Sequence, residues 1–228
     1  MKTIGIIGGM SFESTVVYYR IINAEIARRL GGLHSAKIIL SSLDFAEIEI
    51  LQRENKWDEA AEILSARAKN LQNAGADFII IATNTMHKLA PQIRAAITIP
   101  LLHIAEPTIE KLKKDNIKKV ALIGTKFTME ENFYKEKLKE AGLEVFIPDE
   151  DERKIIHEVI FKELCLGKVK KSSEEKYQKI INDLKARGAQ AVILGCTEIC
   201  MLLKNASLPL YDTTLLHALA AADKALEI

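Results

Sequence analysis

Two stretches of the chain, GADFIIIATNTM at residues 75–86 and GAQAVILGCTEI at residues 188–199, match at a constant offset of 113 positions. Each starts with a Gly-Ala pair typical of a helix end, continues as a short apolar run, and ends in small and polar residues. An apolar run of this length, bounded in this way, predicts a buried β-strand. Two copies in one chain of 228 residues indicate an internal duplication.

Two weaker echoes occur in the same order along the chain. Residues 4–8 resemble residues 120–124, and Pro100-Leu101 resembles Pro209-Leu210. Any two parallel strands look somewhat alike, but three echoes in order favour duplication. We therefore expect two lobes of the same βα design, related by a pseudo-two-fold axis.

The other apolar runs alternate with helical periodicities, which predicts an α/β fold with parallel sheets flanked by helices. The ligand site of such a fold lies at the carboxyl ends of the strands, here in a cleft between the lobes. We predict an N-terminal lobe over 1–103, completed by the C-terminal helix at about 212–228, and a C-terminal lobe over 104–211. The predicted strands cover residues 4–7, 37–41, 78–82, 101–103, 119–123, 144–147, 191–194 and 209–211. The predicted helices cover 14–29, 58–73 with Asp58 as its cap, 106–114, 128–142 with Thr128 as its cap, 153–166, 173–187, and a last helix that ends at Leu226.

The composition excludes several classes of protein. Hydrophobic residues make up 48% of the chain, and 32 basic residues against 31 acidic ones give a net charge of +1. Such a balance provides no basic surface for nucleic acid, and no apolar run approaches the roughly 20 residues of a membrane helix. Three cysteines do not make a disulfide framework, so we expect a cytoplasmic protein with free thiols.

Cys196 follows the second copy of the repeated strand. A cysteine between a strand and a helix lies beside backbone N–H groups, which is expected to favour its thiolate. The alternative is an inert core thiol, but Thr197, Glu198 and the duplication favour a chemical role. Cys200 lies four residues further on, yet no second pair of ligands accompanies it, so we predict no metal site and interpret Cys200 and Cys165 as core thiols.

The polar residues after the first copy are Thr83, Asn84, Thr85, Met86 and His87. The repeat places Thr83 opposite Cys196, so that the two side chains could reach the two faces of one planar carbon. A polar turn that caps the next helix is the alternative, and both interpretations can hold together. We expect His87 to be structural or to line the pocket.

Two further turns follow predicted strands and suit an anion held by backbone N–H groups. They are Gly8-Gly9-Met10-Ser11 and Gly124-Thr125, although either could be a simple strand–helix turn. The first lacks the third glycine of a dinucleotide fingerprint, so it does not indicate a dinucleotide-binding motif. Two such turns suit a substrate with two carboxylates or a zwitterion.

With these motifs in view, the chain resembles the aspartate/glutamate racemase family, the pyridoxal-phosphate-independent amino-acid racemases. The resemblance spans essentially the whole length and rests most on Thr83-Asn84-Thr85 and Gly195-Cys196-Thr197-Glu198. It implies a homodimer and racemisation by two bases without a cofactor, in which Cys196 deprotonates the L-substrate and the opposite residue returns a proton to the other face.

Most of the family has cysteine where this chain has Thr83. A threonine hydroxyl, with a pKa nearer that of water at about 15.7, can pass on a proton but is a poor base, so we expect L-to-D turnover to be favoured. The substrate is expected to be aspartate or glutamate. A broader amino-acid range that includes homoserine, a one-cysteine decarboxylase or isomerase, and a non-enzymatic acid-binding protein are the alternatives. The predicted substrate-binding residues are Met10, Ser11, Gln52, Asn84, Thr85, Thr125, Lys162 and Thr197.

Overall fold

The structure is a computed structural model that describes residues 1–227, and the chain in it divides into two compact units. The first unit comprises Met1–Ile104 and the segment from His217 onward, and the second comprises Ala105–Leu216. The chain therefore leaves the first unit after Ile104 and returns to it after Leu216. Each unit has its own sheet and its own hydrophobic core.

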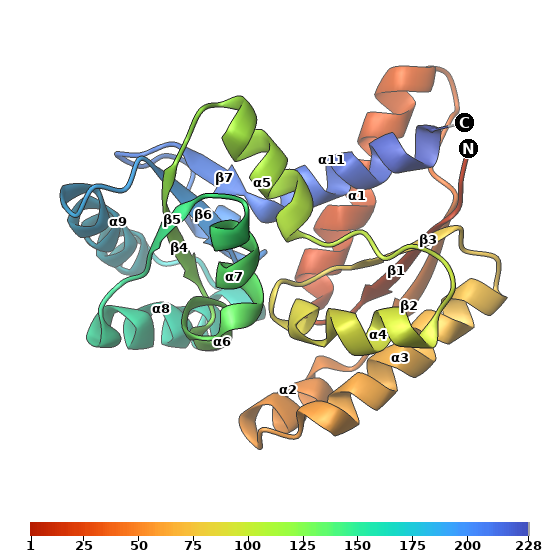
Figure 1. The fold of residues 1–228 in the computed structure, drawn as a ribbon, viewed down its shortest axis with the longest axis horizontal. Helices are drawn as coiled ribbons and strands as arrows, with labels where there is room; N and C mark the ends of the chain where they lie inside the picture. Colours follow the sequence, from red (N-terminus) through yellow and green to blue (C-terminus); the bar gives the residue numbers. More distant parts are fainter. Residues whose placement is uncertain (228) are drawn as a thin grey trace. The chain divides into compact units, whose positions relative to one another are not determined.

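The first unit contains a parallel sheet with the strand order β2-β1-β3 (Figure 1). Ile4 at the start of β1 pairs with Ile38 on one side and with Phe78 on the other. The side chains of Ile4 and Ile6 pack with helices α1 and α11, whereas the backbone of Gly5 faces Leu71 and Ala76 at the end of α3. The elements are β1 (Ile4–Gly8), α1 (Phe12–Leu30), β2 (Ile38–Ser42), α2 (Phe45–Arg53), α3 (Trp57–Asn73), β3 (Phe78–Ile81), the 3₁₀ turn η1 (Thr85–Leu89), α4 (Ala90–Ala96) and α11 (Thr213–Leu226).

The second unit contains a parallel sheet with the order β5-β4-β6-β7 (Figure 1). Ile123 of β4 and Leu194 of β6 belong to a core that includes buried side chains of α8, α9 and α10. Tyr134 and Leu138 of α7 are fully buried as well. The elements are α5 (Ala105–Lys114), β4 (Lys119–Gly124), α6 (Lys126–Glu130), α7 (Asn132–Glu140), β5 (Glu144–Phe146), α8 (Glu150–Lys162), the 3₁₀ turn η2 (Leu164–Leu166), α9 (Lys171–Ala186), β6 (Ala191–Gly195), α10 (Ile199–Leu202) and β7 (Leu210–Asp212).

The two sheets are built alike. In each, the first strand in the sequence is central, the second lies on one side of it and the third on the other. The proline echo has a structural counterpart, since the N–H of Ile79 donates to the carbonyl of Pro100 at 2.8 Å and the N–H of Val192 donates to that of Pro209 at 2.9 Å. The prediction of an α/β fold with two parallel sheets flanked by helices is confirmed.

Some predicted elements of the first unit are wrong. Residues 101–103 form no strand, because Leu101 makes only an isolated bridge to Ile79 before the chain turns into α5. Asp58 does not cap α3, which begins at Trp57 after Lys56. Helix α2 does not follow from the sequence pattern above; Asp44 caps it by accepting from the N–H of Ala46.

In the second unit the errors concern helix boundaries. Thr128 is not a cap, because Thr125 caps the short α6 and the chain breaks at Glu131 before α7 begins. Helix α8 begins at Glu150 instead of residue 153, since Asp149 and Glu152 form a capping box in which each side chain bonds the other residue's backbone N–H. The hydrogen bonds of the capping box, and not the apolar periodicity of the sequence, therefore determine where α8 begins.

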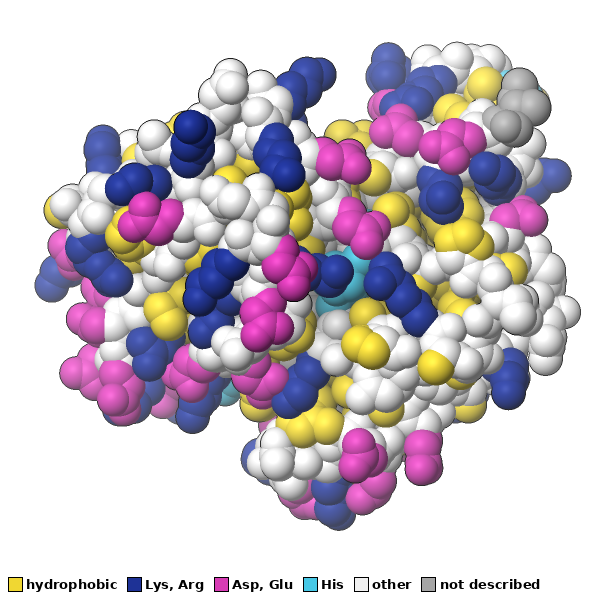
Figure 2. Space-filling view, in the orientation of Figure 1, with side chains coloured by type: hydrophobic (Ala, Val, Ile, Leu, Met, Phe, Trp, Pro, Cys, Tyr) yellow, Lys and Arg dark blue, Asp and Glu magenta, His cyan; other side chains and the backbone are white. Residues whose placement is uncertain are grey.

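Lysine and arginine side chains are intermingled with aspartate and glutamate on the face drawn in Figure 2. Among residues 1–227, no helix has both the length and the apolar character needed to cross a bilayer.

Candidate active site

In the first unit, the turn after β1 is the first predicted binding element. Gly9 has a φ of 87°, and a Cβ on it would collide with the backbone of Leu43. The N–H of Gly9 donates to Thr15 Oγ1 at 2.8 Å, and Ser11 caps α1. The turn is therefore held tightly between β1 and α1, with Met10 and Ser11 both buried.

The turn after β3 carries Thr83 and lies beside the first turn, because β3 pairs directly with β1 and Ala82 donates its N–H to the carbonyl of Ile7. The hydroxyl of Ser14 on α1 donates to the carbonyl of Ala82 at 2.8 Å. His87 Nδ1 lies 2.8 Å from the carbonyl oxygen of Thr83. The backbone carbonyls of Ala82 and Thr83 are therefore both bonded by side chains, and Thr83 itself is half-buried.

The remaining predicted residues of the first unit lie at or next to this turn and are all buried. Asn84 is 2% exposed and Thr85 is 5% exposed, so their polar groups are withdrawn from bulk water. The Nε2 group of Gln52, from α2, lies 3.0 Å from Met86 Sδ in the 3₁₀ turn η1. Gln52 is thus brought to the Thr83 turn from a distant part of the sequence.

In the second unit, the equivalent turns after β4 and β6 are adjacent. Gly124 and Gly195 pair in register, and a Cβ on Gly124 would approach the Gly195 carbonyl to 2.6 Å. The two backbones can pack this closely only because neither residue has a side chain. Thr125 and Cys196 follow these glycines directly, so the structure brings both predicted residues to the same edge of the sheet.

Cys196 is held by its neighbour Glu198. The thiol donates to Glu198 Oε2 at 3.0 Å, and the hydroxyl of Thr197 donates to the same oxygen at 2.7 Å. Burial, together with the charge of Glu198, raises the pKa of the Cys196 thiol well above its usual range. The resting group is therefore a protonated thiol.

The expectation that the thiolate is favoured is wrong. Helix α10 begins only at Ile199 and has four residues, and Glu198 at its N-cap adopts helical backbone angles. The backbone N–H of Glu198 favours the thiolate, as expected of a strand–helix turn, but its effect on the pKa is smaller than those of burial and of the Glu198 carboxylate. Burial is the largest of these effects, and charge repulsion from the Glu198 carboxylate is the next largest.

The other two cysteines are half-buried and pack against the hydrophobic core of the second unit. Burial raises the pKa of Cys200 to about 12, and also raises the pKa of Cys165. Among the described residues, no group of three or more His, Cys, Asp or Glu side chains is arranged to hold a metal ion.

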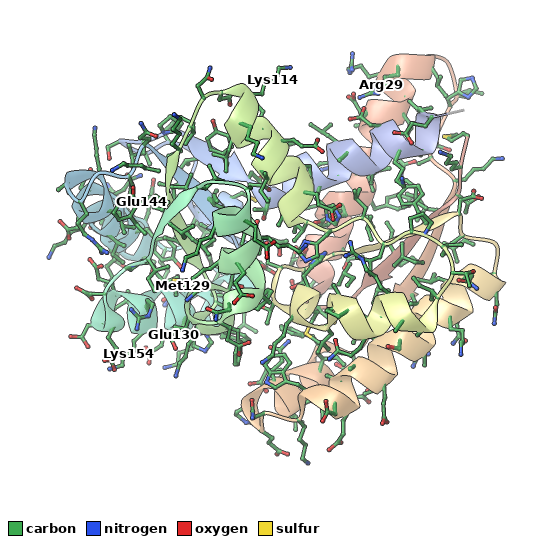
Figure 3. The ribbon with its side chains drawn as sticks, in the orientation of Figure 1. Arg29, Lys114, Met129, Glu130, Glu144 and Lys154 are labelled. Atoms are coloured by element: carbon green, nitrogen blue, oxygen red, sulfur yellow. The ribbon has the colours of Figure 1, made fainter. Side chains whose placement is uncertain are left out.

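Lys162 differs from the other predicted residues. Its side chain is 70% exposed on α8 and lies 3.2 Å from Glu158 one turn earlier. Also on α8, Arg153 donates to Glu130 of α6 at 2.9 Å. Glu130 and the residue before it in the sequence, the fully buried Met129, are labelled in Figure 3. The role of Lys162 with a substrate carboxylate stays a prediction.

Two contributors were missing from the predicted site. Ser14 could not be recognised, because a serine in the first turn of a helix gives no sign of the carbonyl it will bond. Glu198 stands in the motif that drew attention to Cys196, but its contact with the sulfur depends on the tight turn after β6.

Comparison with known proteins shows relatives along the whole chain. The sequence profile of the Asp/Glu/Hydantoin racemase family matches residues 7–221. A solved structure of a candidate Asp/Glu racemase from Yersinia pestis is 50% identical, covers 100% of both chains and has a TM-score of 0.92.

The broad specificity amino-acid racemase RacX of Bacillus subtilis (strain 168) is 35% identical over 92 residues, which is 40% of each chain. The glutamate racemase of Aquifex pyrophilus is 31% identical over 144 residues, 59% of this chain and 51% of that relative. The matches therefore span about half or less of these two curated relatives.

Proposed function

Because the chain belongs to the Asp/Glu/Hydantoin racemase family, we propose that it is an amino-acid racemase that works without a cofactor. We propose aspartate or glutamate as the substrate, with L-to-D turnover favoured. The relatives described as an Asp/Glu racemase and a glutamate racemase support an acidic substrate. The relative described as a broad-specificity racemase supports the alternative of a wider range that includes homoserine.

The observation that carries the proposal is the environment of Cys196. A protonated thiol is a poor base, but its proton points at the Glu198 carboxylate 3.0 Å away. Transfer of that proton to Glu198 leaves a thiolate, which can then take the α-proton from an L-amino acid. Proton transfer by a positioned group of this kind contributes roughly 10²–10⁴-fold to a rate.

Thr83 occupies the position of the first unit that corresponds to Cys196 in the repeat. In our proposal its hydroxyl, or a water that it orients, donates a proton to the opposite face of the planar carbanion. Solvent then restores the hydroxyl proton and takes up the proton held by Glu198, so that the resting thiol and carboxylate are regenerated. A carbanion is basic enough to accept a proton from an alcohol. The reverse step needs an alkoxide or hydroxide, which explains why D-substrate should turn over slowly.

Equilibrium limits this asymmetry. Enantiomers have equal free energies, so kcat/KM must be the same in both directions. A low kcat for the D-enantiomer must therefore come with a proportionally low KM. Measurement of both constants for both enantiomers tests this requirement directly.

The buried polar groups at the strand ends support the proposed binding of the α-carboxylate, the ammonium group and the side-chain carboxylate. In the first unit we assign this role to Met10 and Ser11 after β1, to Asn84 and Thr85 after β3, and to Gln52. In the second unit we assign it to Thr125 and Thr197. All seven residues are less than 9% exposed.

Incubation of the protein with L-aspartate or L-glutamate in D₂O tests the proposal. The expected result is D-product with deuterium at Cα, detected by chiral chromatography and mass spectrometry. Cys196→Ser should abolish product formation, whereas Cys165→Ser, which changes a half-buried thiol of the same core, should retain it. If the unmodified protein releases no D-product from any amino acid tested, the racemase proposal is wrong.

Variants of Thr83 test the second proton donor. Thr83→Cys should raise kcat for the D-enantiomer, because a thiol with a usual pKa near 8.5 is a far better base than an alcohol. Thr83→Ser keeps the hydroxyl and should stay active, whereas Thr83→Val removes it and should slow inversion. Full activity in Thr83→Val would instead favour a one-cysteine reaction in which Thr83 is dispensable.

A further inference from the structure

Three histidines of the first unit are buried beside the Thr83 turn. His87 and His103 are each 1% exposed and His217 is fully buried. The ring centroids of His87 and His103 are 4.5 Å apart, and those of His87 and His217 are 5.7 Å apart. A cluster of this kind needs a defined hydrogen-bond arrangement, because each ring has a donor and an acceptor to satisfy away from water.

The partners of His87 determine where its proton lies. The backbone N–H of Ile104 donates to Nε2 at 3.2 Å, so Nε2 carries no hydrogen. Nδ1 lies 2.8 Å from the carbonyl of Thr83, which can only accept. His87 is therefore a neutral imidazole with its proton on Nδ1, and an imidazolium would place two hydrogens against each other at Ile104.

His217 has the complementary arrangement. Its Nε2 lies 3.0 Å from the carbonyl of Leu102 and must donate, so its Nδ1 accepts from the hydroxyl of Tyr18 at 2.8 Å. Burial lowers the pKa of His87 well below its usual range, with a further contribution from His217 and a smaller one from Arg94. Burial, more than these neighbours, keeps the His87 ring uncharged.

The hydrogen bond from His87 acts on the backbone that carries Thr83. Ser14 holds the carbonyl of Ala82 at 2.8 Å, and His87 holds the next carbonyl, that of Thr83. These two carbonyls belong to the peptide units on either side of the Thr83 Cα, so the two bonds restrict φ and ψ of Thr83 and thereby the direction in which its side chain leaves the backbone. The same imidazole bonds the N–H of Ile104, the last residue before the chain enters the second unit.

We propose that His87 is a positioning residue, which as a neutral imidazole with its proton on Nδ1 fixes the Thr83 turn and thereby aims the Thr83 hydroxyl. The proposal rests on the function proposed above, since it assigns His87 a role in delivery of a proton by Thr83. His87 itself touches no reacting atom in this account. Its effect on the rate is transmitted only through the backbone of Thr83.

Two substitutions separate the two bonds of His87. In His87→Asn the amide Nδ2 can take the place of Nδ1 and keep the bond to Thr83, while the bond to Ile104 is lost. In His87→Gln the longer side chain can place Oε1 near Nε2 and accept from Ile104, while the bond to Thr83 is lost. Both variants remove the ring from the same buried site, so each serves as the structural control for the other.

We expect His87→Gln to lower kcat for L-to-D inversion by about 10- to 100-fold, the scale of a misplaced reacting group, with little change in KM. His87→Asn should retain most of the rate. Amide hydrogen exchange provides a readout that does not depend on activity: exchange over residues 83–85 should accelerate in His87→Gln and not in His87→Asn. Thermal unfolding shows whether the two variants are equally folded.

The possible outcomes separate the two proposals. If the unmodified protein does not racemise any amino acid but exchange over residues 83–85 still accelerates only in His87→Gln, the proposed function is wrong and His87 still fixes the turn. If both variants lose activity and stability in parallel, His87 is merely structural and the inference is overturned. Equal exchange over residues 83–85 in all three proteins also overturns it, whatever the activity.

Discussion

The buried His217 should make the stability of this protein depend on pH, and the size of the effect follows from the structure. Burial lowers the pKa of His217 from 6.5 to about 4. Between these values the unfolded chain binds a proton that the folded protein does not. Stability is therefore fully present above the unfolded pKa and is lost as the pH falls toward the folded one.

The linkage relation turns this shift into a free energy. For one histidine with these two pKa values, the free energy of unfolding should fall by about 2 kcal/mol between about pH 7 and about pH 5. Carboxylates and His87 also contribute to the measured change, so a matched variant is needed. His217→Gln offers one acceptor to Tyr18 and one donor to Leu102 without titrating in this range.

The assay is urea unfolding of both proteins at the two pH values, followed by circular dichroism. The wild-type protein should lose about 2 kcal/mol more than His217→Gln on acidification, whatever the difference between them at neutral pH. Equal losses in the two proteins would refute the reasoning. So would NMR spectra in which the His217 ring is protonated in the folded protein at about pH 6, well above its expected folded pKa.

Two further predictions concern the turns that hold the candidate site. Gly9→Ala should destabilise the protein by more than Gly142→Ala in thermal unfolding. The two glycines have similar φ values of 87° and 86°, but only a Cβ at Gly9 would collide with the backbone, at Leu43. The left-handed backbone alone costs about 1–2 kcal/mol, and equal losses would contradict the close approach seen here. Glu198→Gln should let the Cys196 thiol ionise at lower pH, because the substitution removes the repelling charge and leaves burial unchanged. The measurement is an ultraviolet titration of the thiolate in a protein with Cys165 and Cys200 replaced by serine. An unchanged titration midpoint would contradict the prediction.

Much of the fold could be predicted from local patterns. Runs such as Phe78–Ile81 and Ala191–Gly195 are apolar at every position, which only a strand covered on both faces explains, and the offset of 113 positions between them predicted two similar sheets. The same strands predicted that Thr83 and Cys196 lie at the carboxyl ends of parallel strands. These features depend on residues that are close in sequence, so the sequence alone determines them.

Other features were decided only by contacts between distant residues. The protonation state of Cys196 depends on burial and on a turn that aims Glu198 at the sulfur, whereas the sequence pattern suggested a thiolate. The tautomer of His87 depends on the N–H of Ile104, 17 residues away, and Tyr18 meets His217 across 199 residues. Electrostatic and hydrogen-bond energies depend on distance in space and on exclusion of water, and neither quantity exists until the chain has folded.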